Sequence, residues 1–168
     1  MQKKVFQLLV INTSGVLSRI AGLFARRGYN VESITAGVTA DPRITRITIV
    51  ASGDDEILVQ IETQLAKLEA VRNLKELEPD KSVFRELIMI KVRAAAEQRQ
   101  SIIAVADIFR AKIIEVAPES LIIELTGNQQ KIDAFIDLLE GHEILEQART
   151  GIAGLGRGTE SVVQIDMV

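Results

Sequence analysis

An order of predicted elements that occurs twice along the chain limits the possible folds more than any other feature of this sequence. Strands are expected where β-branched residues are frequent and apolar residues alternate with polar ones. Helices are expected where apolar residues recur every three or four positions. The first copy has strands at 5–11, 30–39, 44–51 and 71–77, and helical stripes at 16–24 and 57–68; the second has strands at 87–94, 112–116, 121–126 and 144–149, and helical stripes at 102–109 and 132–139.

A polar, proline-containing segment at 78–81 separates the two copies and is the best candidate for a linker. Two strand-helix-strand units in series, with both helices on one face of the sheet, describe a ferredoxin-like sandwich. We therefore predict an α+β chain built from two tandem ferredoxin-like βαββαβ domains. Their predicted limits are 1–78 and 82–158, and a C-terminal tail at 159–168 follows without a clear periodic pattern.

The composition argues against several classes of function. A formal net charge of −3 and 4% aromatic residues are poorly suited to binding a phosphate backbone or stacking on bases, so we expect no nucleic-acid partner. The absence of cysteine removes disulfides, thiolate zinc sites and thiol nucleophiles, and favours an intracellular protein. No apolar stretch approaches the roughly 20 residues needed to cross a bilayer, so we expect no membrane contact and a cytoplasmic location.

Few residues in the chain are suited to catalysis. His142 is the only histidine, so an enzyme would depend on His142 acting with an aspartate or glutamate. Carboxylates at 54–56 can bind a divalent ion, but capping of a helix N-terminus explains them more simply. The glycine-rich run at 151–158 lacks the Lys-Ser/Thr of a P-loop, so a flexible segment is the better interpretation. A small enzyme using His142 is therefore the less favoured alternative.

Residues 12–18, Asn-Thr-Ser-Gly-Val-Leu-Ser, join a predicted strand to a predicted helix and have the composition of a ligand-binding loop. A helix N-terminus carries partial positive charge and N–H groups without a partner in the helix, which suits a carboxylate. Gly15 would let a ligand approach the backbone closely. The simpler interpretation is a capped helix start with Ser14 as the N-cap, and the two interpretations are compatible.

A long stretch that begins at this loop resembles the ACT domain of acetolactate synthase (acetohydroxyacid synthase) small regulatory subunits. It reads Asn-Thr-Ser-Gly-Val-Leu-Ser-Arg-Ile-Ala-Gly-Leu-Phe-Ala-Arg-Arg-Gly-Tyr-Asn-Val-Glu-Ser-Ile at 12–34. ACT domains are ferredoxin-like modules that pair side by side and bind small amino acids where they meet. The match continues at 41–49, 60–68, 85–92, 108–116 and 148–152, and it covers roughly residues 2–158.

The resemblance implies a regulatory subunit without catalysis of its own, acting in the biosynthesis of valine, leucine and isoleucine. Its expected partners are a second copy of the chain, valine or a related branched-chain amino acid, and the large catalytic subunit, which it activates and makes sensitive to valine feedback inhibition. Thiamine diphosphate, magnesium and FAD are expected on that large subunit, a transferase, and no cofactor is expected in this chain. The alternative is a free-standing double ACT-like regulator of another enzyme or of transcription, which the match in the second half disfavours.

The same resemblance implies an effector site shared between two chains. The expected residues are Asn12, Gly15, Val16 and Leu17 of one chain, Asn30 and Val31 of its neighbour, and Ile34 and Gly37 beside them. In this arrangement the amides at 15–17 receive the ligand carboxylate, and asparagine oxygens accept hydrogen bonds from its ammonium. Val31 and Ile34 then offer apolar surface to the ligand side chain.

Overall fold

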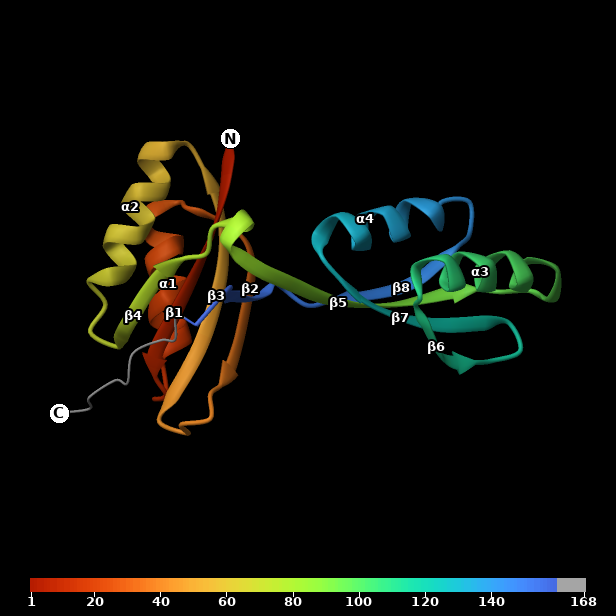
Figure 1. Cartoon of the computed structure of the whole chain (residues 1–168), viewed down its shortest axis with the longest axis horizontal. Helices are drawn as coiled ribbons and strands as arrows, with labels where there is room; N and C mark the ends of the chain where they lie inside the picture. Colours follow the sequence, from red (N-terminus) through yellow and green to blue (C-terminus); the bar gives the residue numbers. More distant parts are fainter. Residues whose placement is uncertain (160–168) are drawn as a thin grey trace. The chain divides into compact units, whose positions relative to one another are not determined.

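The computed structural model describes residues 1–159, which form two compact units with separate cores. The first unit consists of residues 1–83 and 152–159, and the second consists of residues 84–151. Each unit has two helices on one face of an antiparallel sheet (Figure 1). This arrangement confirms the predicted α+β fold of two tandem ferredoxin-like domains. The predicted tail lies outside the described residues from position 160 onward.

The first unit follows the predicted β-α-β-β-α-β order. Its elements are β1 (Gln2–Ile11), α1 (Val16–Arg27), β2 (Asn30–Val38), β3 (Ile44–Gly53), α2 (Asp55–Ala66) and β4 (Val71–Glu76). The sheet order is β2-β3-β1-β4, so β1 and β3 are central and β2 is an edge strand. The central strands are buried at most positions, which their apolar sequences allow.

Apolar side chains on one face of the central strands pack against both helices of the first unit. Phe6, Leu8 and Val10 alternate along β1 with residues of the opposite face, as a strand period of two requires. Fully burying one such side chain contributes about 1.5–3 kcal/mol, so the cluster holds the helices on the sheet. The buried residues of this core are Phe6, Leu8, Val10, Val16, Ile20, Leu23, Phe24, Ile47, Ile49, Ala51, Leu58, Ile61, Leu65 and Ala70.

The second unit repeats the same order with its own core. Its elements are β5 (Ser82–Arg93), α3 (Ala96–Phe109), β6 (Lys112–Val116), β7 (Ser120–Gly127), α4 (Gln129–Leu138) and β8 (Ile144–Arg149). The sheet order is β6-β7-β5-β8, which places β6 and β8 at the edges. Phe109 and Phe135 meet edge to face between the helices, with ring centroids 5.4 Å apart. Such pairs stabilise a core beyond the area that they bury.

Side-chain caps begin the second helix of each unit. The Asp54 carboxylate accepts a hydrogen bond from the Ile57 amide at 2.9 Å, and the Asn128 side chain accepts from the Lys131 amide at 2.9 Å. Asp55 lies in the first turn of α2, where negative charge is favourable. The capping interpretation of the carboxylates at 54–56 is therefore confirmed for Asp54.

The described chain returns to the first unit after β8. Its last strand, β9 (Ala153–Gly156), pairs with β5, and residues 152–159 belong to the first unit. The sequence predicts a second domain at 82–158, whereas the structure groups 152–158 with the first unit. The reason is that this segment makes hydrogen bonds to the first unit: the Arg157 amide donates to the Lys81 carbonyl at 2.8 Å, and Arg46 donates to the Gly154 carbonyl.

Arg46 of β3 holds the returning segment on the face of the first sheet that the helices leave open. Its guanidinium donates to the Gly154 carbonyl oxygen and to Gln7 Oε1, both at 2.6 Å. Burial lowers the pKa of Arg46, but an arginine stays charged at neutral pH. Hydrogen bonds from a charged donor are roughly twice as strong as neutral ones, so Arg46 ties β3 to the C-terminal segment.

Within residues 1–159, no helix is both long enough and apolar enough to span a membrane.

We expect the Phe135→Ala substitution to lower the free energy of unfolding of the second unit by about 3–5 kcal/mol, because it empties a fully buried position. Tyr29 is the only tyrosine and there is no tryptophan, so tyrosine fluorescence reports on the first unit alone. As urea is added, the circular dichroism signal, to which both units contribute, should therefore begin to fall at a lower urea concentration than the one at which Tyr29 fluorescence changes. Leu138→Ala on the same helix is the control, since Leu138 is 53% exposed and should change stability by less than about 0.5 kcal/mol. A parallel shift of both signals would contradict separate unfolding.

Candidate functional site

The loop that joins β1 to α1 has an unusual helix start. Gly15 is the N-cap residue of α1, with φ 82° and ψ −3°, and no side chain caps the helix. The interpretation of Ser14 as the N-cap is therefore wrong. A left-handed backbone is unfavourable for most residues with a Cβ, and glycine adopts it without strain. A Cβ built at Gly15 would meet no atom within 4 Å, so the space in front of the helix is open.

The start of α1 keeps the positive character of a helix N-terminus. Its first turn has no acidic residue, and its last turn carries Arg26 and Arg27. The first helical bonds run from the Val16 amide to Thr13 O, at a long 3.4 Å, and from the Arg19 amide to Gly15 O at 3.0 Å. Neither bond uses the amides of Gly15 or Leu17. These groups are suited to an anion that approaches through the open space.

Asn12 is held beside this helix start by the turn between β2 and β3. Its amide donates to the Arg43 carbonyl at 2.7 Å, and its side-chain nitrogen donates to the Pro42 carbonyl at 2.9 Å. The side-chain oxygen of Asn12 is thereby left as an acceptor. The turn itself is stiffened by Arg43, whose hydrogen bond lowers the pKa of Asp41 to about 2. Pro42 and Arg43 are not among the predicted site residues, although the Asp-Pro turn signal marks their position.

Val16 and Leu17 differ in what they can contribute. Val16 is 6% exposed and belongs to the core, so its side chain anchors the helix start and only its backbone faces the loop. Leu17 is 49% exposed and can contact a ligand or a second chain.

The remaining predicted site residues lie on edge strand β2. A β-bulge between Val31 and Ser33 puts Val31 and Ile34, three positions apart, opposite Ala51 and Ile49, so both face the helix side. Gly37 pairs with Arg46 and lies on the other face. The Asn30 side-chain nitrogen donates to Ser52 Oγ at 2.7 Å, which leaves its oxygen as an acceptor.

Within one chain, the loop residues and the start of β2 lie at opposite ends of the sheet. Asn30 pairs with Ser52 near one end of β3, whereas Ile11, next to the loop, pairs with Ile44 at the other end. Val38 lies eight residues after Asn30 along β2, and eight steps along a strand span about 26 Å. The structure therefore brings Asn12, Gly15, Val16 and Leu17 together, but it does not bring Asn30 and Val31 to them.

The single histidine does not form a catalytic triad. His142 Nε2 lies 3.1 Å from Ser101 Oγ, but His142 Nδ1 is buried and has no hydrogen-bond partner. A serine nucleophile needs a third group, commonly a carboxylate, that orients the histidine through this second nitrogen. Glu143, the nearest acidic residue in sequence, is bound to Arg93 instead.

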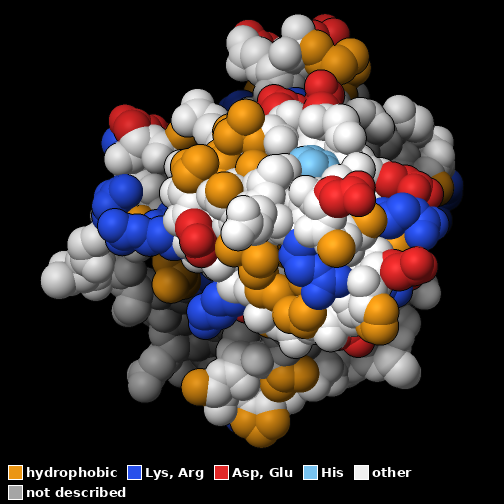
Figure 2. Space-filling view, turned by 90° about the vertical axis from the view of Figure 1, so that its right-hand side faces the viewer, with side chains coloured by type: hydrophobic (Ala, Val, Ile, Leu, Met, Phe, Trp, Pro, Cys, Tyr) orange, Lys and Arg blue, Asp and Glu red, His pale blue; other side chains and the backbone are white. Residues whose placement is uncertain are grey.

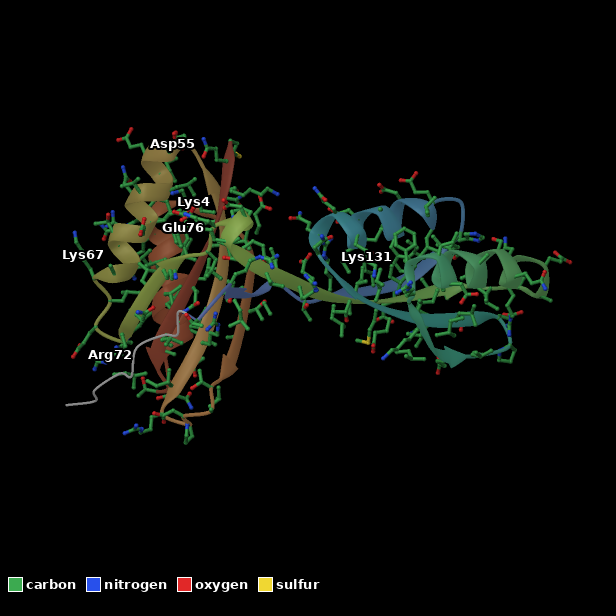
Figure 3. The ribbon with its side chains drawn as sticks, in the orientation of Figure 1. Lys4, Asp55, Lys67, Arg72, Glu76 and Lys131 are labelled. Carbon is green, nitrogen blue, oxygen red and sulfur yellow. The ribbon has the colours of Figure 1, made fainter. Side chains whose placement is uncertain are left out.

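Lys4 is the lysine that most resembles a catalytic amine, because it is partly buried on β1 (Figure 3). Its ammonium donates to Glu76 of β4 at 2.7 Å. That hydrogen bond, with smaller contributions from the charges of Glu62 and Asp55, raises the pKa of Lys4. A nucleophilic lysine requires a lowered pKa, so Lys4 acts as a structural cation that joins two strands.

One hollow of about 560 Å³ lies in the first unit near the end of β4, and no predicted site residue lines it. Its lining is polar and carries both signs of charge. Glu78 is paired with Lys81 at 2.8 Å and Glu76 with Lys4 at 2.7 Å. A pocket for a branched-chain amino acid would also have hydrophobic residues around the ligand side chain, and none of the lining residues is hydrophobic. The lining residues are Lys75, Glu76, Glu78, Asp80, Lys81, Ser82, Gly156, Arg157 and Gly158.

Two family models match this chain and leave little of it uncovered. Residues 6–73 match an acetohydroxyacid synthase small subunit-like ACT domain, and residues 85–158 match the small subunit of acetolactate synthase. The probable acetolactate synthase small subunit of Methanothermobacter thermautotrophicus is 47% identical over 94% of this chain and 95% of that protein. The chain belongs to the acetolactate synthase small-subunit family.

Bacterial members of the acetolactate synthase small-subunit family support the same assignment. The small subunit of Escherichia coli acetolactate synthase isozyme 3 is 41% identical over 93% of this chain and 96% of that protein. The crystal structure of the acetolactate synthase small subunit from Thermotoga maritima superposes with a TM-score of 0.87 and 41% identity, and it covers 95% of this chain and all of that one. Family membership and fold therefore agree over nearly the whole length.

We expect the Gly15→Ala substitution to lower the free energy of unfolding by about 1–2 kcal/mol, because alanine is strained at φ 82°. Gly37→Ala is the matched control: a Cβ there also meets nothing within 4 Å, but its φ is not positive. Urea unfolding of the two variants separates backbone strain from steric effects. Equal stability of both variants would show that Gly15 does not need the left-handed conformation.

Proposed function

We propose that this chain is the regulatory subunit of an acetolactate synthase, which binds a branched-chain amino acid, in the first place valine, and controls the large catalytic subunit. The observation that carries the ligand part is the open, uncapped start of α1 at Gly15. Family membership supports the partner, because the relatives are small subunits of this enzyme. The cytoplasmic location expected from the sequence belongs to the same proposal.

The chemistry of the loop suits the polar part of an amino acid. The ligand carboxylate would accept hydrogen bonds from the amides of Gly15 and Leu17, with the helix dipole favouring its negative charge. The ligand ammonium would donate to the side-chain oxygens of Asn12 and Asn30, whose nitrogens are already committed to Pro42 and Ser52. A short branched side chain would contact Leu17, Val31 and Ile34.

A homodimer completes this site. If the edge strands β2 of two copies pair antiparallel, the Asn30 end of one strand lies beside the Val38 end of the other. The Val38 end is also the end of the sheet at which Asn12 and Gly15 lie, since Ile11 pairs with Ile44. Two equivalent sites then form, each with a loop from one copy and the start of β2 from the other. This geometry explains why one chain alone separates the two groups of residues.

The reaction of the holoenzyme is assigned to the large subunit, on the resemblance. Thiamine diphosphate, magnesium and FAD would be held there, and this chain would supply regulation only. Within residues 1–159 there is no group of three or more His, Cys, Asp or Glu side chains that could hold a metal ion.

We expect the chain to sediment as a homodimer at micromolar concentration and to melt at a higher temperature in valine. A ligand that binds only the folded pair, at 100 times its dissociation constant, stabilises by about 2.7 kcal/mol. For a chain of this size that corresponds to a shift of roughly 5–10 °C. The same measurement with leucine and isoleucine ranks the three amino acids by the increase in melting temperature that each one causes. Glycine, which lacks the apolar side chain, should cause a smaller increase. A monomer with no shift in millimolar valine would contradict the shared site.

We expect the Gly15→Asp substitution to abolish valine inhibition of the reconstituted enzyme while the variant still activates the large subunit. The aspartate would fill the open space, bond to the same amides and repel the ligand carboxylate. Gly15→Asn is the matched control, because asparagine has the same size and also tolerates the left-handed backbone but carries no charge. The measurement is acetolactate formation by the large subunit against valine concentration.

The Gly15→Asn variant should keep part of its valine sensitivity, with a raised half-inhibitory concentration. Circular dichroism must show that both variants are folded. Unchanged valine inhibition in a folded Gly15→Asp variant would place the effector elsewhere.

A further inference from the structure

The turn between β2 and β3 fixes the orientation of the Asn12 side chain. The Asn12 amide donates to the Arg43 carbonyl at 2.7 Å, and Asn12 Nδ2 donates to the Pro42 carbonyl at 2.9 Å. A backbone carbonyl can only accept a hydrogen bond. If the side-chain amide turned over, its oxygen would face the Pro42 oxygen and the bond would be lost. The contact with Pro42 therefore decides which end of the amide stays available as an acceptor.

Asn30, the other asparagine of the proposed site, lacks such a constraint. Its side-chain nitrogen donates to Ser52 Oγ at 2.7 Å. A hydroxyl group both donates and accepts, so the contact with Ser52 would survive if the Asn30 amide turned over. Of the two asparagines, only Asn12 thus has an orientation that the chemistry of its partner dictates.

The turn that carries these carbonyl groups is braced by its own side chains. Asp41 Oδ1 accepts from the Arg43 amide at 3.0 Å, and Arg43 Nη2 donates to Asp41 Oδ2 at 2.7 Å. Thr39 Oγ1 accepts from the Asp41 amide at 3.2 Å and donates to the Asp41 carbonyl at 2.9 Å. Both charged side chains are exposed, so water screens their attraction, and the bonds to the backbone matter more. Asp41 is therefore the residue on which the shape of this turn depends most.

The second unit has the same junction with a different side chain. The Ala94 amide at the end of β5 donates to the Glu119 carbonyl in the turn between β6 and β7, at 2.8 Å. The side-chain contact with this turn comes from Arg99, whose guanidinium donates to the Ala117 and Pro118 carbonyls, both at 2.7 Å. A guanidinium has no acceptor. The second unit therefore anchors its turn without leaving an oxygen for a ligand ammonium.

The single histidine, His142 of the second unit, lies on the face drawn in Figure 2. Around it Lys and Arg side chains lie beside Asp and Glu side chains, with hydrophobic ones between them. A small anion gains most where positive charge is concentrated or where helix amides are open. This face of the second unit therefore offers no replacement for the loop of the first.

A fixed acceptor at Asn12 selects among ligands by the group on their C2 atom. The ammonium of an amino acid donates to this oxygen. The C2 carbonyl of a 2-oxo acid is itself an acceptor, so two oxygens would meet with no hydrogen between them. A site built for one hydrogen bond rejects an analogue that cannot make it, and one such mismatch changes affinity roughly ten- to hundredfold.

We infer that the turn at 39–44 is a positioning element that makes the effector site select an amino acid over the 2-oxo acid of the same carbon skeleton, by holding Asn12 with its side-chain oxygen as the acceptor. Asn12 touches the ligand, whereas Asp41 and Arg43 act only through Asn12. The inference rests on the effector site of the proposed function and concerns its selectivity alone.

The test compares three ligands that share a carboxylate and an isopropyl group: valine, 2-hydroxy-3-methylbutanoate and 3-methyl-2-oxobutanoate. At C2 they carry a charged donor, a neutral group that donates and accepts, and an acceptor. Calorimetric titration of the full chain should rank their affinities in this order, with the 2-oxo acid at least roughly tenfold weaker than valine. Equal affinity for valine and the 2-oxo acid would overturn the inference. A chain that binds none of the three would overturn the proposed function, and the selectivity with it.

The Asn12→Ala substitution removes the acceptor itself. Valine should bind roughly tenfold more weakly, whereas the affinity for the 2-oxo acid should stay the same or rise. Asn12→Asp is the matched control, because it keeps an oxygen at this position and should still prefer valine. If Asn12→Ala weakened both ligands by the same factor, the asparagine would not act through its acceptor oxygen and the inference would fail.

The Asp41→Ala substitution tests the positioning role, because it loosens the turn and leaves Asn12 in place. The amide is then free to turn its nitrogen toward the ligand, so the ratio of valine affinity to 2-oxo acid affinity should fall roughly fivefold. Asp41→Asn keeps an acceptor for the Arg43 amide and should keep most of this ratio. Glu78→Ala, which removes the ion pair with Lys81 elsewhere in the first unit, should leave the ratio unchanged.

The ratio separates positioning from folding, since a general loss of structure weakens both ligands together. An unchanged ratio in a folded Asp41→Ala variant, or the same fall in Glu78→Ala, would show that the turn does not set the selectivity.

Discussion

The pairing of β1 with β3 is the constraint on which the rest of the first unit depends. It runs without interruption from Gln2 and Gly53 to Ile11 and Ile44, and its helix-side residues form the core. This register sends the loop after β1 to one end of the sheet, whereas Asn30 begins β2 at the other end. A site that needs both groups must therefore take one of them from a second chain. For the proposed effector site, it is this strand register that calls for a second copy of the chain.

The two units share one architecture and differ at its ends. Both have two helices on an antiparallel sheet, and both have a bulge near the start of the second strand. They differ where the first strand meets the first helix. In the first unit, Gly15 leaves the start of the helix without a side-chain cap. In the second unit, the Arg99 guanidinium fills the corresponding junction and donates hydrogen bonds to three carbonyl groups. Recognition of a small anion needs open backbone amides, whereas a structural junction needs its carbonyl groups satisfied.

The segment at 152–158 gives the first unit a hydrogen bond that strands β1 to β4 do not make among themselves. Arg46 stands opposite Gly37 of β2 in the register and donates to the carbonyl of Gly154. Strand β3 thus pairs with β2, the proposed dimer edge, and through Arg46 it also binds the segment that follows the second unit. Because Arg46 is partly buried and charged, its bonds are costly to break without replacement. The segment is therefore an integral part of the first unit and not a loose end.

The sequence by itself determined the order of the elements, both cores and the cap at Asp54, because periodicity and capping are interactions between residues close together in the chain. It also led to the loop at Gly15 and, through resemblance, to the family. Only the tertiary structure decided that Gly15 replaces Ser14 as the N-cap, that β2 and β6 are bulged, and that residues 152–158 rejoin the first unit. These features depend on hydrogen bonds between residues far apart in the chain, and no local pattern of side chains specifies such partners.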